Sequence, residues 1–387
     1  MKQYRSERKE QRHMTGSVLL SALYFLVCLL IGYGVAVMLE EQTGGALRTL
    51  PFVICLIVAF FLQNALHSLG HLLFGKLLGM RVIALSLFRQ VHVKEKEHFR
   101  TRQYLPESLL CSCLMAPPPD SEGVYTLFWL GGAIFNLLIG LLALLLLMVC
   151  RLSLASLGGC LAFCFFITGI GLFCFRALPL ERSHVPNDAM KAWRLYQDPG
   201  QRACWSLLTG MLSVLSEEET PVEKVPVAYL KQPEAADTVF STALLLMQYD
   251  WFLWLNRWDE AEQCLQKLVA AKENCPEEWR QRIEQECIFF LGTQGLAENL
   301  PAGFLTKEKA QRYETQATPE SLRCLYAWSL TGISGVRQSK QYHEAAVKAA
   351  NQIAFRPAAQ GYKRVIARCG EIRNNQMRSK EESKWEF

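Results

Sequence analysis

The chain has 387 residues, enough for two or more domains, and it combines 51% hydrophobic with 20% charged residues. Long uncharged segments precede residue 176 and densely charged sequence follows it, which excludes a single soluble domain and predicts a membrane half followed by a water-soluble half. The net charge of +5 arises mostly in loops facing anionic lipid and does not indicate nucleic-acid binding. Most of the 14 cysteines lie in predicted spans or a reducing compartment, so we interpret them as small apolar residues.

Four uncharged segments are long enough to cross a bilayer, and they predict a mainly α fold. A basic N-terminus, 1–15, precedes the first segment, and the positive-inside rule places it in the cytoplasm. We therefore expect a four-span polytopic membrane domain over 16–195, a linker over 196–235 and a cytoplasmic all-α domain over 236–387, with both termini in the cytoplasm. The predicted spans are 16–38, 51–78, 124–150 and 152–175.

The second predicted span contains two histidines, His67 and His71, in an otherwise uncharged run. On a helix these positions lie one turn apart on the same face, so both imidazoles can reach one metal ion. The spacing is that of the zincin motif H-E-x-x-H, in which the glutamate is the general base. Here Ser68 occupies the glutamate position, so the pattern predicts a metal site without its base.

The motif L-H-S-L-G-H-L-L-F-G-K-L-L-G resembles the metal-binding helix of the site-2 protease family of intramembrane zinc metallopeptidases. The resemblance extends over about residues 15–195. It implies a zinc ion, a bacterial cell membrane as the location, and a transmembrane segment of a protein as substrate or partner. It also places a small sheet near the substrate path in the loop 81–122, where alternating residues at 82–93 predict short strands. We expect His92 and His98 to be exposed loop histidines.

Two further elements match family motifs. Asn136 ends a G-G-x-x-x-N element in the third span, and the resemblance gives it contact with the substrate backbone or a ligand; an interhelical hydrogen bond is the alternative. Asp188, in the segment Pro-Asn-Asp after the fourth span, matches the family's third zinc ligand. The alternative for Asp188 is a helix N-cap. The chain departs from the second motif around Arg176, where asparagine is usual, and at Ala189, where glycine is common.

Three functions are compatible with this sequence, and the activity itself is uncertain. The first is a catalytically degenerate metallopeptidase homologue, a pseudoprotease that binds or regulates membrane-embedded partners. The second is an active intramembrane zinc endopeptidase in which Glu181 or His184 replaces the missing base. The third is a membrane-tethered helical scaffold with a vestigial metal site.

The C-terminal half predicts paired amphipathic helices after a linker at Glu217–Pro221. The pattern is tetratricopeptide-like, with a plain helical bundle as the alternative, because the spacing is irregular. A concave face of such a domain would bind a peptide or helix partner, unless its tryptophans, Trp251, Trp254 and Trp258, only fill the core. The expected helices are 239–255, 259–272, 277–291, 320–330 and 342–353.

Overall fold

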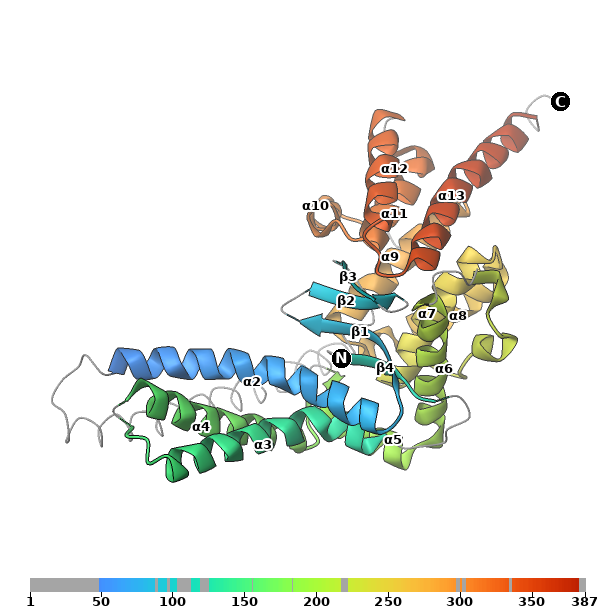
Figure 1. Ribbon diagram of the computed structural model, residues 1–387. Coiled ribbons are helices and arrows are strands. Elements are labelled where there is room, and N and C mark those ends of the chain that lie inside the picture. Colours follow the sequence, from blue (N-terminus) through green and yellow to red (C-terminus); the bar gives the residue numbers. More distant parts are fainter. Residues whose placement is uncertain are drawn as a thin grey trace, which may run out of the picture. The chain divides into compact units, whose positions relative to one another are not determined.

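The computed structural model describes residues 49–87, 90–95, 98–102, 113–118, 125–154, 156–182, 184–216, 222–296, 300, 304–333 and 336–382 (Figure 1). These residues are mainly helical. The chain separates into two compact units, residues 1–82 with 111–202 and residues 83–110 with 203–387. The predicted first span, 16–38, the basic N-terminus and the linker 217–221 lie outside the described residues.

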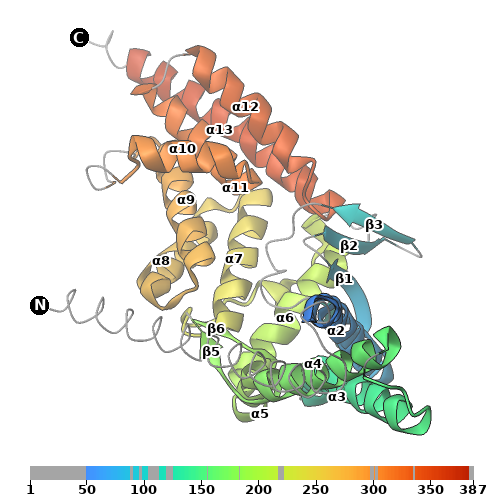
Figure 2. The same cartoon turned by 90° about the vertical axis from the view of Figure 1, so that its left-hand side faces the viewer.

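Three long apolar helices form the centre of the first unit. They are α2 (Thr49–Leu77), α3 (Thr126–Val149) and α4 (Leu157–Ala177), and they pack against one another side by side (Figures 1 and 2). Each is long and apolar enough to cross a membrane. Large apolar side chains such as Ile57 and Leu145 are exposed on their outer faces, as expected for helices whose surroundings are lipid.

The fourth predicted span begins later than expected. Arg151 has a φ of 48°, and residues 151–154 turn the chain between α3 and α4. The Ser156 hydroxyl accepts a hydrogen bond from the Gly159 amide at 3.1 Å and caps α4. The predicted start at residue 152 is therefore wrong, because the cap places the start at Leu157.

Glycines allow α2 and α3 to approach closely. A Cβ on Gly70 would lie 2.6 Å from the Gly131 carbonyl oxygen, and a Cβ on Gly132 would lie 2.4 Å from His67 Cε1. Such small residues are typical of helix contacts in membranes. Here they let one histidine ring lie directly against the backbone of α3.

Four short strands form a sheet in the order β3-β2-β1-β4. They are β1 (Arg81–Leu87), β2 (Gln90–Glu95), β3 (His98–Arg102) and β4 (Cys113–Ala116). The pairs β1–β2 and β2–β3 are antiparallel, with Val93 opposite both Ala84 and Arg100. The strands predicted over 82–93 are confirmed. His92 lies on β2 and His98, which is exposed as expected, begins β3, so neither histidine lies in a loop.

A short hairpin and a helix follow α4. The hairpin pairs β5 (Glu181–Arg182) with β6 (Val185–Pro186), and α5 (Asp188–Gln197) then packs against α3 and α4. The hairpin thus leads the chain from the end of α4 back to α5, which lies beside the three apolar helices. Helix α6 (Pro199–Ser216) continues from there.

The second unit is helical beyond α6. The predicted helices correspond to α7 (Val239–Trp254), α8 (Trp258–Ala271), α9 (Glu277–Thr293), α11 (Pro319–Trp328) and α12 (Val336–Ala350). Helix α12 begins earlier and ends earlier than predicted. Two further helices, α10 (Lys307–Gln316) and α13 (Arg356–Glu382), were not expected, and α12 and α13 lie side by side in Figure 2. Short 3-10 helices, at Val222–Lys224, Val227–Leu230 and Lys272–Asn274, and a π-helical turn, Ser329–Ile333, complete the unit.

Helix α7 forms the core of this unit, since every one of its residues is buried. Trp251 and Trp254 are 0% and 2% exposed, so they fill the core rather than line an open surface. Their rings pack with centroids 5.4 Å apart. Repeat or bundle architecture for this unit stays a prediction.

Candidate metal centre

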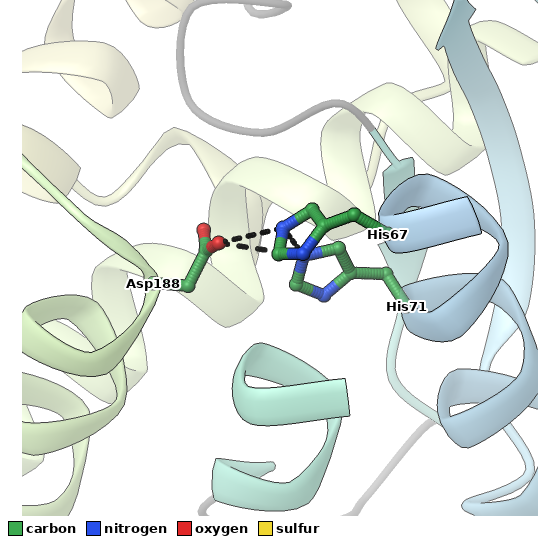
Figure 3. A group of neighbouring side chains, drawn as sticks. All are labelled: His67, His71 and Asp188. Carbon is green, nitrogen blue, oxygen red and sulfur yellow. Dashed lines mark hydrogen bonds and ion pairs between the residues drawn. The ribbon is translucent and has the colours of Figure 1, made fainter. Parts of the chain in front are cut away.

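His67 and His71 face one side of α2, as their spacing predicts. They are 2% and 1% exposed, and their rings meet edge to face with centroids 4.7 Å apart (Figure 3). Buried imidazoles inside an apolar helix require polar partners. The partners come from α3 and α5.

Asp188 reaches the histidine pair from the first turn of α5 (Figure 3). The N-cap of α5 is Asn187, whose Oδ1 accepts a hydrogen bond from the Met190 amide at 2.9 Å. The N-cap alternative for Asp188 is therefore wrong, and its carboxylate is available to the site. The Asn187 amide also donates to the carbonyls of Phe175 and Leu178, at 3.2 and 2.7 Å, which ties the start of α5 to the end of α4.

Three ligand atoms converge in a nearly equilateral triangle. His67 Nε2 lies 3.0 Å from Asp188 Oδ2 and 3.1 Å from His71 Nε2, and His71 Nε2 lies 3.5 Å from Asp188 Oδ2. In a tetrahedral zinc site with bonds of about 2.0–2.1 Å, neighbouring ligand atoms lie about 3.3 Å apart. The triangle thus has the dimensions of one face of such a tetrahedron, and this buried group could hold a metal ion.

The hydrogen bonds around the site determine how many protons the three ligand atoms can share. His71 Nδ1 lies 2.8 Å from the Phe128 carbonyl oxygen, which only accepts, so Nδ1 carries the proton and Nε2 of the neutral ring presents a lone pair. A proton on His67 Nε2 can be donated to His71 or to Asp188, but not to both. With both imidazoles neutral, the three atoms therefore share at most one proton, and a cation between them, either an additional proton or a metal ion, would stabilise the group.

Asn136 lies beside the other nitrogen of His67. Its Nδ2 is 3.5 Å from His67 Nδ1, and its buried Oδ1 accepts no hydrogen bond within the described part of the chain. With the amide turned over, Oδ1 would accept a proton from His67 Nδ1, which leaves the His67 Nε2 lone pair for a metal. Asn136 thus contacts His67 across the α2–α3 interface, and its contact with a substrate stays a prediction.

Two basic side chains surround Asp188. Lys191 Nζ lies 3.6 Å from Asp188 Oδ1, and Arg176 Nη1 lies 3.9 Å from Oδ2. Burial raises the pKa of the Asp188 carboxyl, but the hydrogen bond with His67 and the charge of Lys191 together lower that pKa well below its usual value. Asp188 is therefore an anion at neutral pH. Lys191 was not predicted from the sequence, where its only signal is its position three residues after Asp188 on the same helix face.

The proposed substitute bases do not join this group. Within the described residues the cluster of potential ligands contains only His67, His71 and Asp188. The Glu181 carboxylate pairs with Arg194 at 2.7 Å, and His184 lies in the β5–β6 turn with a φ of 63°. Ser68 is 8% exposed and stands at the base position of the motif.

No protein-family model, curated protein or solved structure matches this chain. The site must therefore be interpreted from its own residues and geometry.

Proposed function

We propose that this chain is a multi-pass membrane protein that holds zinc through His67, His71 and Asp188 and binds a transmembrane segment of a protein partner without cleaving it. The observation that carries the proposal is the triangle formed by two imidazole nitrogens from the membrane-length helix α2 and one carboxylate oxygen from the first turn of α5. Two nitrogens and one oxygen at tetrahedral spacing suit Zn²⁺ better than Mg²⁺ or Ca²⁺, which prefer oxygen ligands.

The second part of the proposal depends on Ser68. A zinc ion in this site would supply Lewis acidity. Hydrolysis also needs a general base, a role worth about 10²–10⁴-fold, and a serine hydroxyl is no base at neutral pH. The likeness of the His67–His71 helix to site-2 proteases supports a membrane-embedded segment as the bound partner. We further propose that the protein lies in a bacterial cell membrane with both termini in the cytoplasm.

Replacement of Ser68 separates binding from catalysis. The probe is a co-expressed single-span membrane protein with a different epitope tag at each end. We expect no cleavage by the wild type and cleavage by Ser68→Glu, which adds a carboxylate next to the first ligand. Ser68→Gln, similar in size but uncharged, should stay inactive, and Ser68→Glu with His71→Ala should lose the activity gained.

Efficient cleavage by the wild type, changed little by Ser68→Glu, would refute the pseudoprotease assignment and show that another residue is the base. Binding is tested with the same probe by site-specific photocrosslinking from Leu69, an exposed neighbour of Ser68. A crosslink to the span of the probe, absent when the crosslinker is placed at Leu178 instead, supports the binding role.

A further inference from the structure

Lys191 places a buried ammonium group beside the metal centre. Its side chain is 6% exposed, and Nζ lies 3.6 Å from Asp188 Oδ1 and 5.0 Å from the ring centroid of Trp129. Asp188 and Lys191 are three residues apart on α5, so they share one face of the helix. A lysine is rarely buried to this extent unless an anion compensates its charge.

The two oxygens of the Asp188 carboxylate have different neighbours. Oδ2 faces the histidines, at 3.0 Å from His67 and 3.5 Å from His71, with the Arg176 guanidinium farther away at 3.9 Å. Oδ1 faces Lys191. The same carboxylate thus interacts with the metal-binding atoms and with a fixed positive charge. A metal ion on Oδ2 and the ammonium on Oδ1 would be drawn to one anion from opposite sides.

The charge of Lys191 affects the relative stability of the metal-bound and metal-free states. A divalent ion at the ligand triangle would be repelled by the nearby ammonium, and this repulsion is strong where water is excluded. In the metal-free protein the ammonium compensates the buried carboxylate, so the empty site does not leave an unpaired charge. Both effects stabilise the metal-free state relative to the metal-bound state.

We propose that Lys191 is an internal competitor for Asp188 that weakens zinc binding and allows the site to exist in both metal-free and metal-bound forms. This inference rests on the proposed zinc site. It assigns to Lys191 a role in metal affinity through its charge, rather than a role as a ligand.

The test is the zinc affinity of the full chain in detergent, measured by competition with a chromophoric chelator. Lys191→Gln and Lys191→Met remove the charge, and we expect both to bind zinc at least about tenfold more tightly than the wild type. Lys191→Arg retains the charge and should match the wild type. Lys76→Gln, at an exposed lysine in the last turn of α2, is the matched control and should change nothing. Elution of each variant as the wild-type species in size-exclusion chromatography shows that it is folded.

The alternatives give different results. If Lys191 only positions Asp188, Lys191→Met should weaken zinc binding, and that result overturns the inference. Equal affinities in all variants overturn it as well, while the zinc site stands. Failure of the wild type and of every variant to bind zinc overturns both the inference and the zinc site.

Discussion

At the scale of single residues, the orientation of the two imidazoles explains how the site could hold a cation. The Phe128 carbonyl fixes the proton of His71 on Nδ1, and Asn136 lies at the corresponding nitrogen of His67. Partners of this kind set the tautomer of ligating histidines, and their loss typically costs about 10–100-fold in metal affinity. In the proposed site, Asn136 would therefore orient His67 and affect the affinity for the metal.

We expect Asn136→Ala to weaken zinc binding by about 10–100-fold, because His67 loses the group that orients its ring. Asn136→Asp should retain more affinity, since a carboxylate can accept the Nδ1 proton. Thr168→Ala is the control, because Thr168 is buried on α4 and bonds only to carbonyls of its own helix among the contacts described. Competition with a chelator measures the zinc affinity of all three variants. Equal losses of zinc affinity in Asn136→Ala and Thr168→Ala would argue against an orienting role of Asn136.

At the scale of elements, the site depends on how α5 is joined to α4. Asn187 caps α5 and holds the end of α4, so one side chain fixes the position from which Asp188 reaches the histidines. The loop hydrogen bonds between Leu180 and Asn187 add to this connection, at 2.9 and 3.1 Å. The location of Asp188 is thus a property of the hairpin and its cap.

Asn187→Ala should destabilise the chain by about 0.5–2 kcal/mol, the usual cost of a lost cap, and should also weaken zinc binding. Asn187→Asp keeps the acceptor for the Met190 amide but loses the two donated bonds, so its zinc affinity should lie between those of Asn187→Ala and the wild type. Ser156→Ala removes the cap of α4 at the other end of that helix. It should lower thermal stability without lowering zinc affinity; a matching loss of affinity would contradict the account of Asn187.

The sequence predicted those parts of the fold that depend on local pattern. His67 and His71 are one turn apart, so a helix alone brings them together. Asp188 lies 121 residues from His67, and only the likeness to a family suggested the contact.

Helix α13 was missed because Gly361 indicates a break in a helix. In the structure a Cβ at this position would lie 2.5 Å from Trp254 Cγ, so the packing requires a glycine inside the helix. Helix α10 was missed because its one fully buried residue, Tyr313, gives no apolar period.

At the scale of the whole molecule, each unit has a buried polar centre. In the second unit Arg323 lies 3.2 Å from Asp250 and 2.5 Å from Glu286, and Tyr362 donates to Asp250 at 3.0 Å or Glu320 at 2.9 Å. These side chains come from α7, α9, α11 and α13, so the cluster joins segments that are distant in sequence. Removing one member would leave another charge unpaired in the core.

This cluster predicts a pH dependence of stability. Burial raises the pKa of Glu286 to about 7, although the charge of Arg323 opposes the rise. Its ordinary value is lower, so Glu286 contributes stability that is fully present below the unfolded-state pKa and is lost as pH rises through about 7. Relative to Glu286→Gln, which cannot titrate, the wild-type Tm should therefore fall between about pH 5 and 8. A constant difference in Tm would contradict the raised pKa.

Zinc analysis of the purified full chain tests the central claim most directly. We predict about one zinc per chain in the wild type and in His92→Ala, a histidine on β2 outside the ligand group. His67→Ala, His71→Ala and Asp188→Ala should each lose the metal on dialysis, because two remaining protein ligands leave the ion exchangeable. A wild type that binds no zinc, or an Asp188→Ala variant that retains it as firmly as the wild type, would contradict the assignment of these three residues as the metal centre.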